Sequence, residues 1–89
     1  ADVDRPRAVL AVVDATNLRR NLFLVTQLAE LGLPLVVALN LSDAAEARGI
    51  RIDAARLGAR LNARVVPVSA ARGSGLAGLR AALAEALVA

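Results

Sequence analysis

Three short apolar runs divide this chain, and polar residues follow each of them. The runs are residues 8–13, 35–39 and 65–68, built from valine, leucine, alanine and one proline. Continuous apolar runs of this length are typical of strands buried on both faces of a parallel sheet. The pattern therefore predicts three parallel strands.

The segment between the first two strands has helical periodicity. Its apolar positions recur at Leu18, Leu22, Val25 and Ala29. We expect a helix over residues 18–31, with Asn17 as its N-cap. Gly32 and Pro34 are placed to end this helix.

Two further helices and one helical turn are predicted downstream. Residues 44–48 form the turn, which Gly49 ends, and Asp53 is placed as the N-cap of a helix that runs to Leu61. The last helix follows the glycine-rich residues 73–75. Its apolar stripe consists of Leu76, Leu79, Leu83 and Leu87.

The element order is therefore β-α-β-α-β-α, and the expected fold is a three-layer α/β partial domain over residues 1–89. Right-handed crossovers place the first two main helices on one face of the sheet, and the last helix can return over the other face. Ligands of such sheets bind beyond the carboxyl ends of the strands. Function is therefore expected at that edge.

The composition narrows the function classes. The chain is 57% hydrophobic with one aromatic residue, Phe23, so an aliphatic core is expected. All eleven basic residues are arginine and are dispersed along the chain, which argues against a nucleic-acid-binding face. With no cysteine or histidine, disulfides and the usual transition-metal ligands are not expected. The longest near-continuous apolar stretch, residues 31–39, is too short to span a membrane, and the charged N-terminus does not resemble a signal peptide.

The second and third strands each end in a polar tetrad, N-L-S-D at residues 40–43 and S-A-A-R at residues 69–72. N-x-x-D followed by S-A-x, each at the carboxyl end of a strand, is the pattern with which GTPases bind a guanine base. The chain has no lysine, so the phosphate loop G-x-x-x-x-G-K-[ST] is not in it. The tetrads therefore predict a base-binding region without the phosphate-binding one.

Each residue of the tetrads has an expected role. Asp43 is expected to accept hydrogen bonds from N1–H and the N2 amino group of guanine, and Asn40 to contact the N7 side and tie the loop to its neighbours. Ser69 would brace the second loop and leave the backbone N–H of Ala70 free to bond O6. Leu41 and Ala71 complete the nucleotide-binding set. The alternative is that Asn40 and Asp43 only cap the following turn.

Other polar residues near the strand ends are assigned structural roles. Asp14 and Thr16 follow the first strand and are interpreted as loop and cap residues. A phosphoacceptor receiver domain also has a parallel sheet, but it needs a lysine that this chain lacks. Arg72 with Gly73 and Gly75 could cradle a phosphate, although the glycines are better explained by a close backbone approach to the base.

The chain closely resembles the bacterial ferrous iron transport protein B family. The resemblance rests on residues 13–22, which match V-D-A-T-N-L-x-R-N-L, and on residues 38–43, 48–53 and 65–70. It implies the C-terminal half of a cytoplasmic GTPase domain from a Fe²⁺ transporter, at the cytoplasmic face of the bacterial inner membrane. The implied ligand is GTP or GDP; the Mg²⁺ ligands and the catalytic residues would lie upstream, so no catalytic or metal-binding residue is assigned here.

Several expectations follow from this resemblance. Leu41 and Ala71 stand where many GTPases have lysine, which predicts weak nucleotide affinity and fast release. The rest of the GTPase domain and the transmembrane part are implied partners. The bare edge of the first strand, or the face left uncovered, predicts self-association. Two alternatives to the function in a Fe²⁺ transporter stay open. The chain is a fragment of a GTPase of ribosome assembly or tRNA modification, or it is a non-catalytic α/β interaction module.

Overall fold

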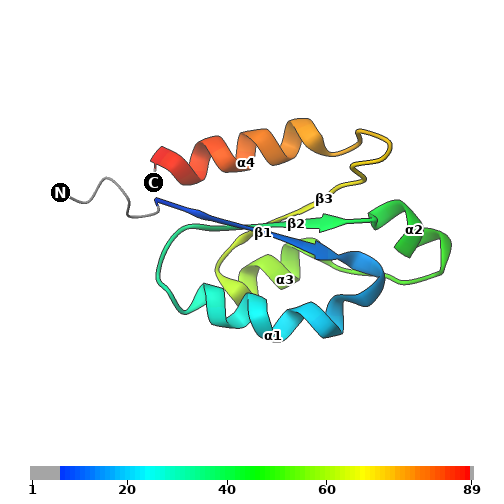
Figure 1. The fold of residues 1–89 in the computed structure, drawn as a ribbon, viewed down its shortest axis with the longest axis horizontal. Coiled ribbons are helices and arrows are strands. Elements are labelled where there is room, and N and C mark those ends of the chain that lie inside the picture. Colours follow the sequence, from blue (N-terminus) through cyan, green and yellow to red (C-terminus); the bar gives the residue numbers. More distant parts are fainter. Residues whose placement is uncertain (1–6, 89) are drawn as a thin grey trace.

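The computed structural model describes residues 7–88, which form a parallel sheet of three strands (Figure 1). The strands are β1 (Val9–Asp14), β2 (Leu35–Asn40) and β3 (Arg64–Pro67). Their order in the sheet is β1-β2-β3, so β2 is central. Val13 pairs with Leu39, and Val37 pairs with Val65. This register brings the carboxyl ends of all three strands to one edge.

Helices cover both faces of the sheet. They are η1 (Ala15–Asn17), α1 (Leu18–Ala29), α2 (Ser42–Ala47), α3 (Ala54–Leu61) and α4 (Leu76–Val88). Figure 1 shows α1 and α3 on one face and α4 on the opposite face, with α2 beyond the end of β2. The predicted three-layer α/β fold in β-α-β-α-β-α order is confirmed.

The central strand β2 supplies most of the core. Leu35, Val37 and Leu39 point toward the α1 and α3 layer, where they pack with the side chains of β1 and with Val25. Val36 points the other way and packs against Ala82 and Ala86 of α4. Residues 35–39 are almost inaccessible to solvent. The continuous apolar run therefore reflects burial of both faces of one strand.

The first helix begins at Leu18 with Asn17 at the predicted N-cap position, but the capping hydrogen bond expected from the Asn17 side chain is not formed. Asn17 is also the last residue of η1. Asp14 caps this 3₁₀ turn, and its Oδ1 accepts from the backbone N–H of Thr16 at 2.8 Å. The helix also ends earlier than predicted, at Ala29, with Gly32 at a φ of +74° beyond it.

The predicted start of α3 is confirmed. The Oδ1 atom of Asp53 accepts a hydrogen bond from the backbone N–H of Arg56 at 3.0 Å. Gly58 lets this helix approach β3, because a Cβ at that position would lie 2.6 Å from the carbonyl oxygen of Ala63. None of the helices in residues 7–88 combines the length and the apolar character needed to cross a membrane.

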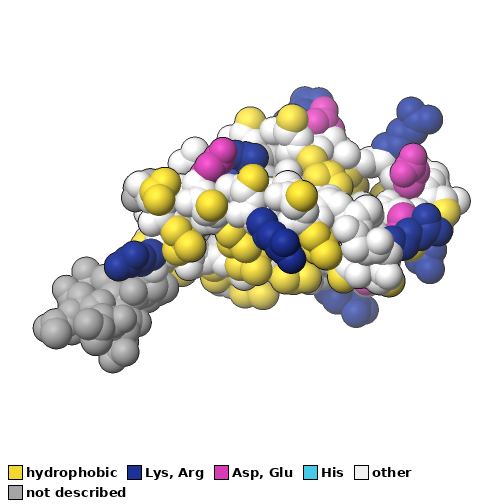
Figure 2. Space-filling view, turned by 90° about the horizontal axis from the view of Figure 1, so that it is seen from above, with side chains coloured by type: hydrophobic (Ala, Val, Ile, Leu, Met, Phe, Trp, Pro, Cys, Tyr) yellow, Lys and Arg dark blue, Asp and Glu magenta, His cyan; other side chains and the backbone are white. Residues whose placement is uncertain are grey.

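One apolar face of β1 is not covered by a helix. Leu10 and Val12 alternate with residues that face the α1 layer, so they point to the α4 side, and Val12 is 62% exposed. In the view onto α4, hydrophobic side chains gather beside that helix (Figure 2). The structure pairs β1 only with β2 among the described residues, which leaves its other edge open.

Candidate functional site

Two loops lie side by side beyond the carboxyl ends of β2 and β3. We call them the β2 loop (residues 40–43) and the β3 loop (residues 69–74). The backbone N–H of Ser42 donates to the carbonyl of Val68 at 3.1 Å. The backbone N–H of Ala70 donates to Oδ1 of Asn40, also at 3.1 Å. The two tetrads found in the sequence therefore form one continuous surface.

Asn40 connects the two loops through its side-chain amide. It is the last residue of β2, directly across the sheet from Asp14. Its Oδ1 accepts from Ala70, as the expected tie between the loops requires. The expectation that the Ala70 N–H is free was wrong for this structure, because that N–H already has Asn40 as its partner.

Leu41 has a left-handed backbone conformation at the start of α2. Its φ is 62° and its ψ is 28°, a conformation that costs a non-glycine residue roughly 1–2 kcal/mol. The sharp turn places Ser42 so that its hydroxyl donates to the carbonyl of Leu39 at 2.5 Å. The side chain of Leu41 remains exposed beside the loops. The strain at Leu41 therefore turns the chain directly from strand to helix.

Asp43 lies in the first turn of α2 and faces the β3 loop. Its side chain is 32% exposed, and its Oδ2 lies 3.0 Å from Nε of Arg72. A hydrogen bond from the Ser69 hydroxyl lowers the pKa of Asp43, with smaller contributions in the same direction from the Ala44 backbone N–H and the Arg72 charge, while burial opposes them. The carboxylate is therefore ionised at neutral pH and can only accept hydrogen bonds.

The β3 loop is closed at its base by a short antiparallel bridge. The backbone N–H of Ser69 donates to the carbonyl of Ser74 at 3.0 Å, and the reverse bond measures 3.2 Å. Ser69 itself is only 2% exposed, whereas Ala70 and Ala71 are exposed at the tip. Gly75, at a φ of +78°, follows at a point where a Cβ would lie 2.3 Å from the carbonyl oxygen of Pro67.

Asp14 and Thr16 lie at the same edge of the sheet, but they form hydrogen bonds with each other. Besides the backbone bond of the cap, the Thr16 hydroxyl donates to Oδ1 of Asp14 at 2.6 Å. This hydrogen bond is the largest cause of the lowered pKa of Asp14. The capping interpretation of these two residues therefore agrees with the structure.

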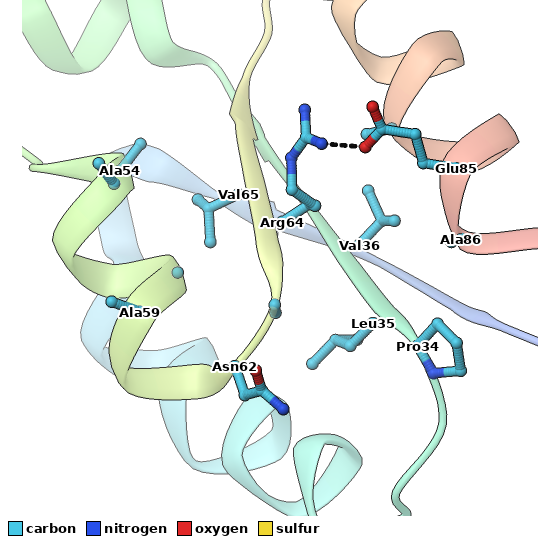
Figure 3. A pocket seen from close by; sticks show the side chains of 14 residues that line it. Pro34, Leu35, Val36, Ala54, Ala59, Asn62, Arg64, Val65, Glu85 and Ala86 are labelled. Atoms are coloured by element: carbon cyan, nitrogen blue, oxygen red, sulfur yellow. Dashed lines mark hydrogen bonds and ion pairs between the residues drawn. The ribbon is translucent and has the colours of Figure 1, made fainter. Parts of the chain in front are cut away.

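The surface has two larger hollows, and one of them lies away from the carboxyl edge of the sheet. One, of about 480 Å³, lies under α2 and is lined by residues including Ala15, Leu39 and Pro67. A larger and more open hollow of about 720 Å³ lies between α3, β3 and α4, where the ion pair of Arg64 with Glu85 crosses it (Figure 3). Its other lining is mainly alanine and valine, and no predicted site residue lines it. We therefore place the candidate site at the two loops, where convergent polar groups are found.

The ion pair between Arg72 and Asp43 was not anticipated from the sequence. The opposite charges of Asp43 and Arg72 in the two tetrads indicated that an ion pair was possible, but the sequence contains ten other arginines that are also candidates. Arg72 reaches it because the loop turns back at Ser69, whose carbonyl accepts from the Arg72 backbone N–H at 3.1 Å. Only the folded loop makes this pairing evident.

A parallel sheet that carries N-x-x-D and S-A loops in hydrogen-bonded contact at its carboxyl edge has the architecture of a GTPase fold. A sequence model described as "Ferrous iron transport protein B" matches residues 3–83. The chain belongs to the ferrous iron transport protein B family.

Curated relatives agree with this assignment. The chain is 49% identical over 75 residues to the Fe(2+) transporter FeoB of Escherichia coli K12, and the match covers 84% of the chain and 10% of the relative. The same figures apply to the Fe(2+) transporter FeoB of Salmonella typhimurium. The chain therefore spans about one tenth of the curated relatives that it matches.

Solved structures share the fold closely. The FeoB G-domain of Methanococcus jannaschii superposes with a TM-score of 0.90 at 42% identity, over 98% of this chain and 54% of that one. NFeoB from S. thermophilus bound to mGMPPNP gives a TM-score of 0.87 at 39% identity, over 94% and 32%. NFeoB from S. thermophilus bound to GDP·AlF4⁻ and K⁺ gives a TM-score of 0.79 at 40% identity, over 93% of this chain and 31% of that one. The GTPase fold is therefore shared at substantial sequence identity.

Proposed function

We propose that this chain is the guanine-recognising, C-terminal half of a G domain that belongs to a Fe²⁺ transporter. The observation that carries the proposal is the hydrogen-bonded pair of loops that places the ionised Asp43 beside Asn40 and Ala70. The guanine nucleotide analogues named for the S. thermophilus structures support it. The ligand we propose is GTP or GDP.

Base selection follows from the donors and acceptors at this edge. The carboxylate of Asp43 accepts from N1–H and the N2 amino group of guanine, whereas adenine presents a lone pair at N1 that the carboxylate repels. Such paired contacts contribute about 1–3 kcal/mol of discrimination. Asn40 lies at the N7 side of the base, and Leu41 and Ala71 flank it as apolar neighbours.

Ser69 and Ala70 of the β3 loop have different roles in this proposal. Ser69, buried under the loop, holds Asp43 in place. The Ala70 N–H donates to O6 of the bound base, sharing its hydrogen between O6 and Asn40 or exchanging one acceptor for the other. Without a base this N–H is held on Oδ1 of Asn40, so that bond has to be shared or given up when O6 binds.

Hydrolysis is assigned outside this chain. With no lysine, the chain contains no G-x-x-x-x-G-K-[ST] loop to hold the phosphates. We place phosphate binding, Mg²⁺ and the catalytic residues in an upstream half of the same domain. GTP turnover there would be coupled to Fe²⁺ uptake, at the cytoplasmic face of the inner membrane.

We further propose that the chain self-associates when its upstream half is absent. The open edge of β1 and the exposed Leu10 and Val12 beside it form a strand template of the kind that pairs with other chains. The remaining half of the G domain is the proposed partner of this surface, and a transmembrane part is a further proposed partner of the chain.

The experiment that tests the proposed function exchanges the base specificity. In the G domain that carries this chain, Asp43→Asn should change the preference from GDP to xanthosine diphosphate, because the amide can donate to the additional carbonyl of xanthine. Isothermal titration with GDP, ADP and xanthosine diphosphate measures the change. Asp53→Asn, at the cap of α3, is the matched control and should keep the preference for GDP. Equal, weak binding of all three nucleotides to both variants and to the unaltered protein would favour the interaction-module alternative.

A further inference from the structure

We propose that Arg72 is an affinity-determining residue of the base site, because its guanidinium occupies Asp43 when no base is bound and must leave before guanine can be read. The inference rests on the proposed function and adds a residue to it. It follows from the position of one ion pair at the junction of the two loops.

The ion pair lies at the point where the base would bind. Nε of Arg72 is 3.0 Å from Oδ2 of Asp43, so the guanidinium contacts the carboxylate that is proposed to select the base. The Arg72 side chain is 74% exposed, and Ser69, which lies on the inner side of the same loop, is buried. The pair therefore lies on the solvent side of the β3 loop.

The two oxygens of the carboxylate make Arg72 and guanine competitors. The contact of Arg72 with Asp43 is made on Oδ2. N1–H and the N2 amino group of guanine lie side by side, so guanine would use both oxygens of the carboxylate as acceptors. The guanidinium and the base therefore compete for the same oxygen.

Arg72 is the donor that can leave at the least cost. Ser69 is buried and the Ala44 N–H belongs to the backbone of α2, so neither can move away without disturbing the loop. The guanidinium is on a flexible and exposed side chain that water can solvate when the pair opens. The loop can therefore keep its shape while the pair opens.

The test is GDP binding by the G domain that carries this chain, with and without Arg72. Removal of a competing, exposed ion pair should tighten GDP binding by a factor of about 1.5 to 5 in Arg72→Ala. The factor should fall toward one as salt is raised, because salt screens the exposed pair in the unaltered protein. Arg72→Lys keeps a cation and should stay close to the unaltered affinity. Arg60→Ala on α3 is the matched control for loss of one positive charge.

A double substitution separates competition from a general change in the loop. In an Asp43→Asn background the neutral amide no longer attracts Arg72, so adding Arg72→Ala should leave xanthosine diphosphate binding unchanged. Unchanged or weaker GDP binding by Arg72→Ala overturns the inference, as does an equal effect in the Asp43→Asn background. These outcomes can be distinguished from a failure of the proposed function, because in that case the unaltered protein itself would show no preference for guanine.

A measurement without nucleotide tests the ion pair by itself in the 89-residue chain. The carboxyl-carbon NMR signal of Asp43 is followed against pH, and the midpoint should be higher in Arg72→Ala than in the unaltered chain because a neighbouring positive charge has been removed. The same midpoint in both chains would show that the guanidinium does not occupy the carboxylate and would overturn the inference.

Discussion

The side-chain oxygen of Asn40 accepts a hydrogen bond from the backbone N–H of Ala70 at 3.1 Å, which joins the ends of two neighbouring strands. The strand pair β2 and β3 brings these residues together although they are 30 positions apart. This bond makes the two loops depend on each other, and it can be tested with one substitution.

Replacing Asn40 with alanine should loosen the β3 loop. The lost hydrogen bond has an expected net contribution of about 0.5–1.5 kcal/mol to the free energy of unfolding. Amide hydrogen exchange at Ala70 should accelerate, while exchange in β2 should keep its rank among the slowest sites. Gln27→Ala, on the exposed face of α1, is the control. Equal exchange at Ala70 in Asn40→Ala and the control would contradict the role of this bond.

Two glycines of the same region should differ in their tolerance of a side chain. Gly75 and Gly73 both have positive φ angles, of 78° and 72°, but only Gly75 has a backbone carbonyl in the place of a Cβ. We expect Gly75→Ala to lower the free energy of unfolding by about 3 kcal/mol or more. Gly73→Ala should cost about 1 kcal/mol, from strain alone. Urea unfolding measures both, and equal costs would argue against the close approach to Pro67.

Stability should fall with acid through Asp14. The Thr16 hydroxyl, followed by the Thr16 backbone N–H, lowers the pKa of Asp14 below its ordinary value of 3.8. A carboxyl whose pKa is lower in the folded state stabilises the fold above 3.8, and this contribution is lost as the pH falls through the folded-state pKa. Urea midpoints should therefore change little between about pH 7 and 5 and decrease below pH 4.

Two variants isolate that effect. Asp14→Asn should reduce the loss of stability between pH 5 and 3, because the amide does not titrate. Thr16→Val should raise the pKa of Asp14, as measured by NMR, because the hydroxyl bond is removed. An acid dependence that both variants leave unaltered would assign it to other carboxyls.

The exposed face of β1 should control self-association. Val12→Lys places a charge on this face and should shift the chain toward the monomer in sedimentation velocity at high concentration. Leu24→Lys, at the similarly exposed residue on α1, is the matched control and should leave the association unaltered. A chain that is monomeric at every concentration would contradict the proposed association.

The fold was predictable from the sequence wherever local patterns decide it. The apolar run 35–39 has no polar position because both faces of β2 are buried, and Asp53 caps α3 because its side chain needs only the next turn. The 3₁₀ turn η1, with Asp14 as its N-cap, was not predictable, because the sequence pattern does not show that a separate turn precedes α1.

The meeting of the two loops at one edge of the sheet was predictable from the sequence, but the contacts between them were less so. Asn40 and Asp43 follow from N-x-x-D at a strand end. The partner of the Ala70 N–H and the ion pair of Arg72 depend on how two loops distant in sequence meet. Such contacts are decided by the register of β2 against β3, which residue patterns within each strand do not contain.

The burial of β2 gives the two halves of the site different local stabilities. Residues 35–39 are almost inaccessible and hydrogen-bonded on both sides, so their amides exchange only when the whole sheet opens. The tip of the β3 loop is exposed and held by few bonds, so it can open by local unfolding alone. The β3 side of the candidate site can therefore open and close while Asn40 stays fixed on an intact sheet.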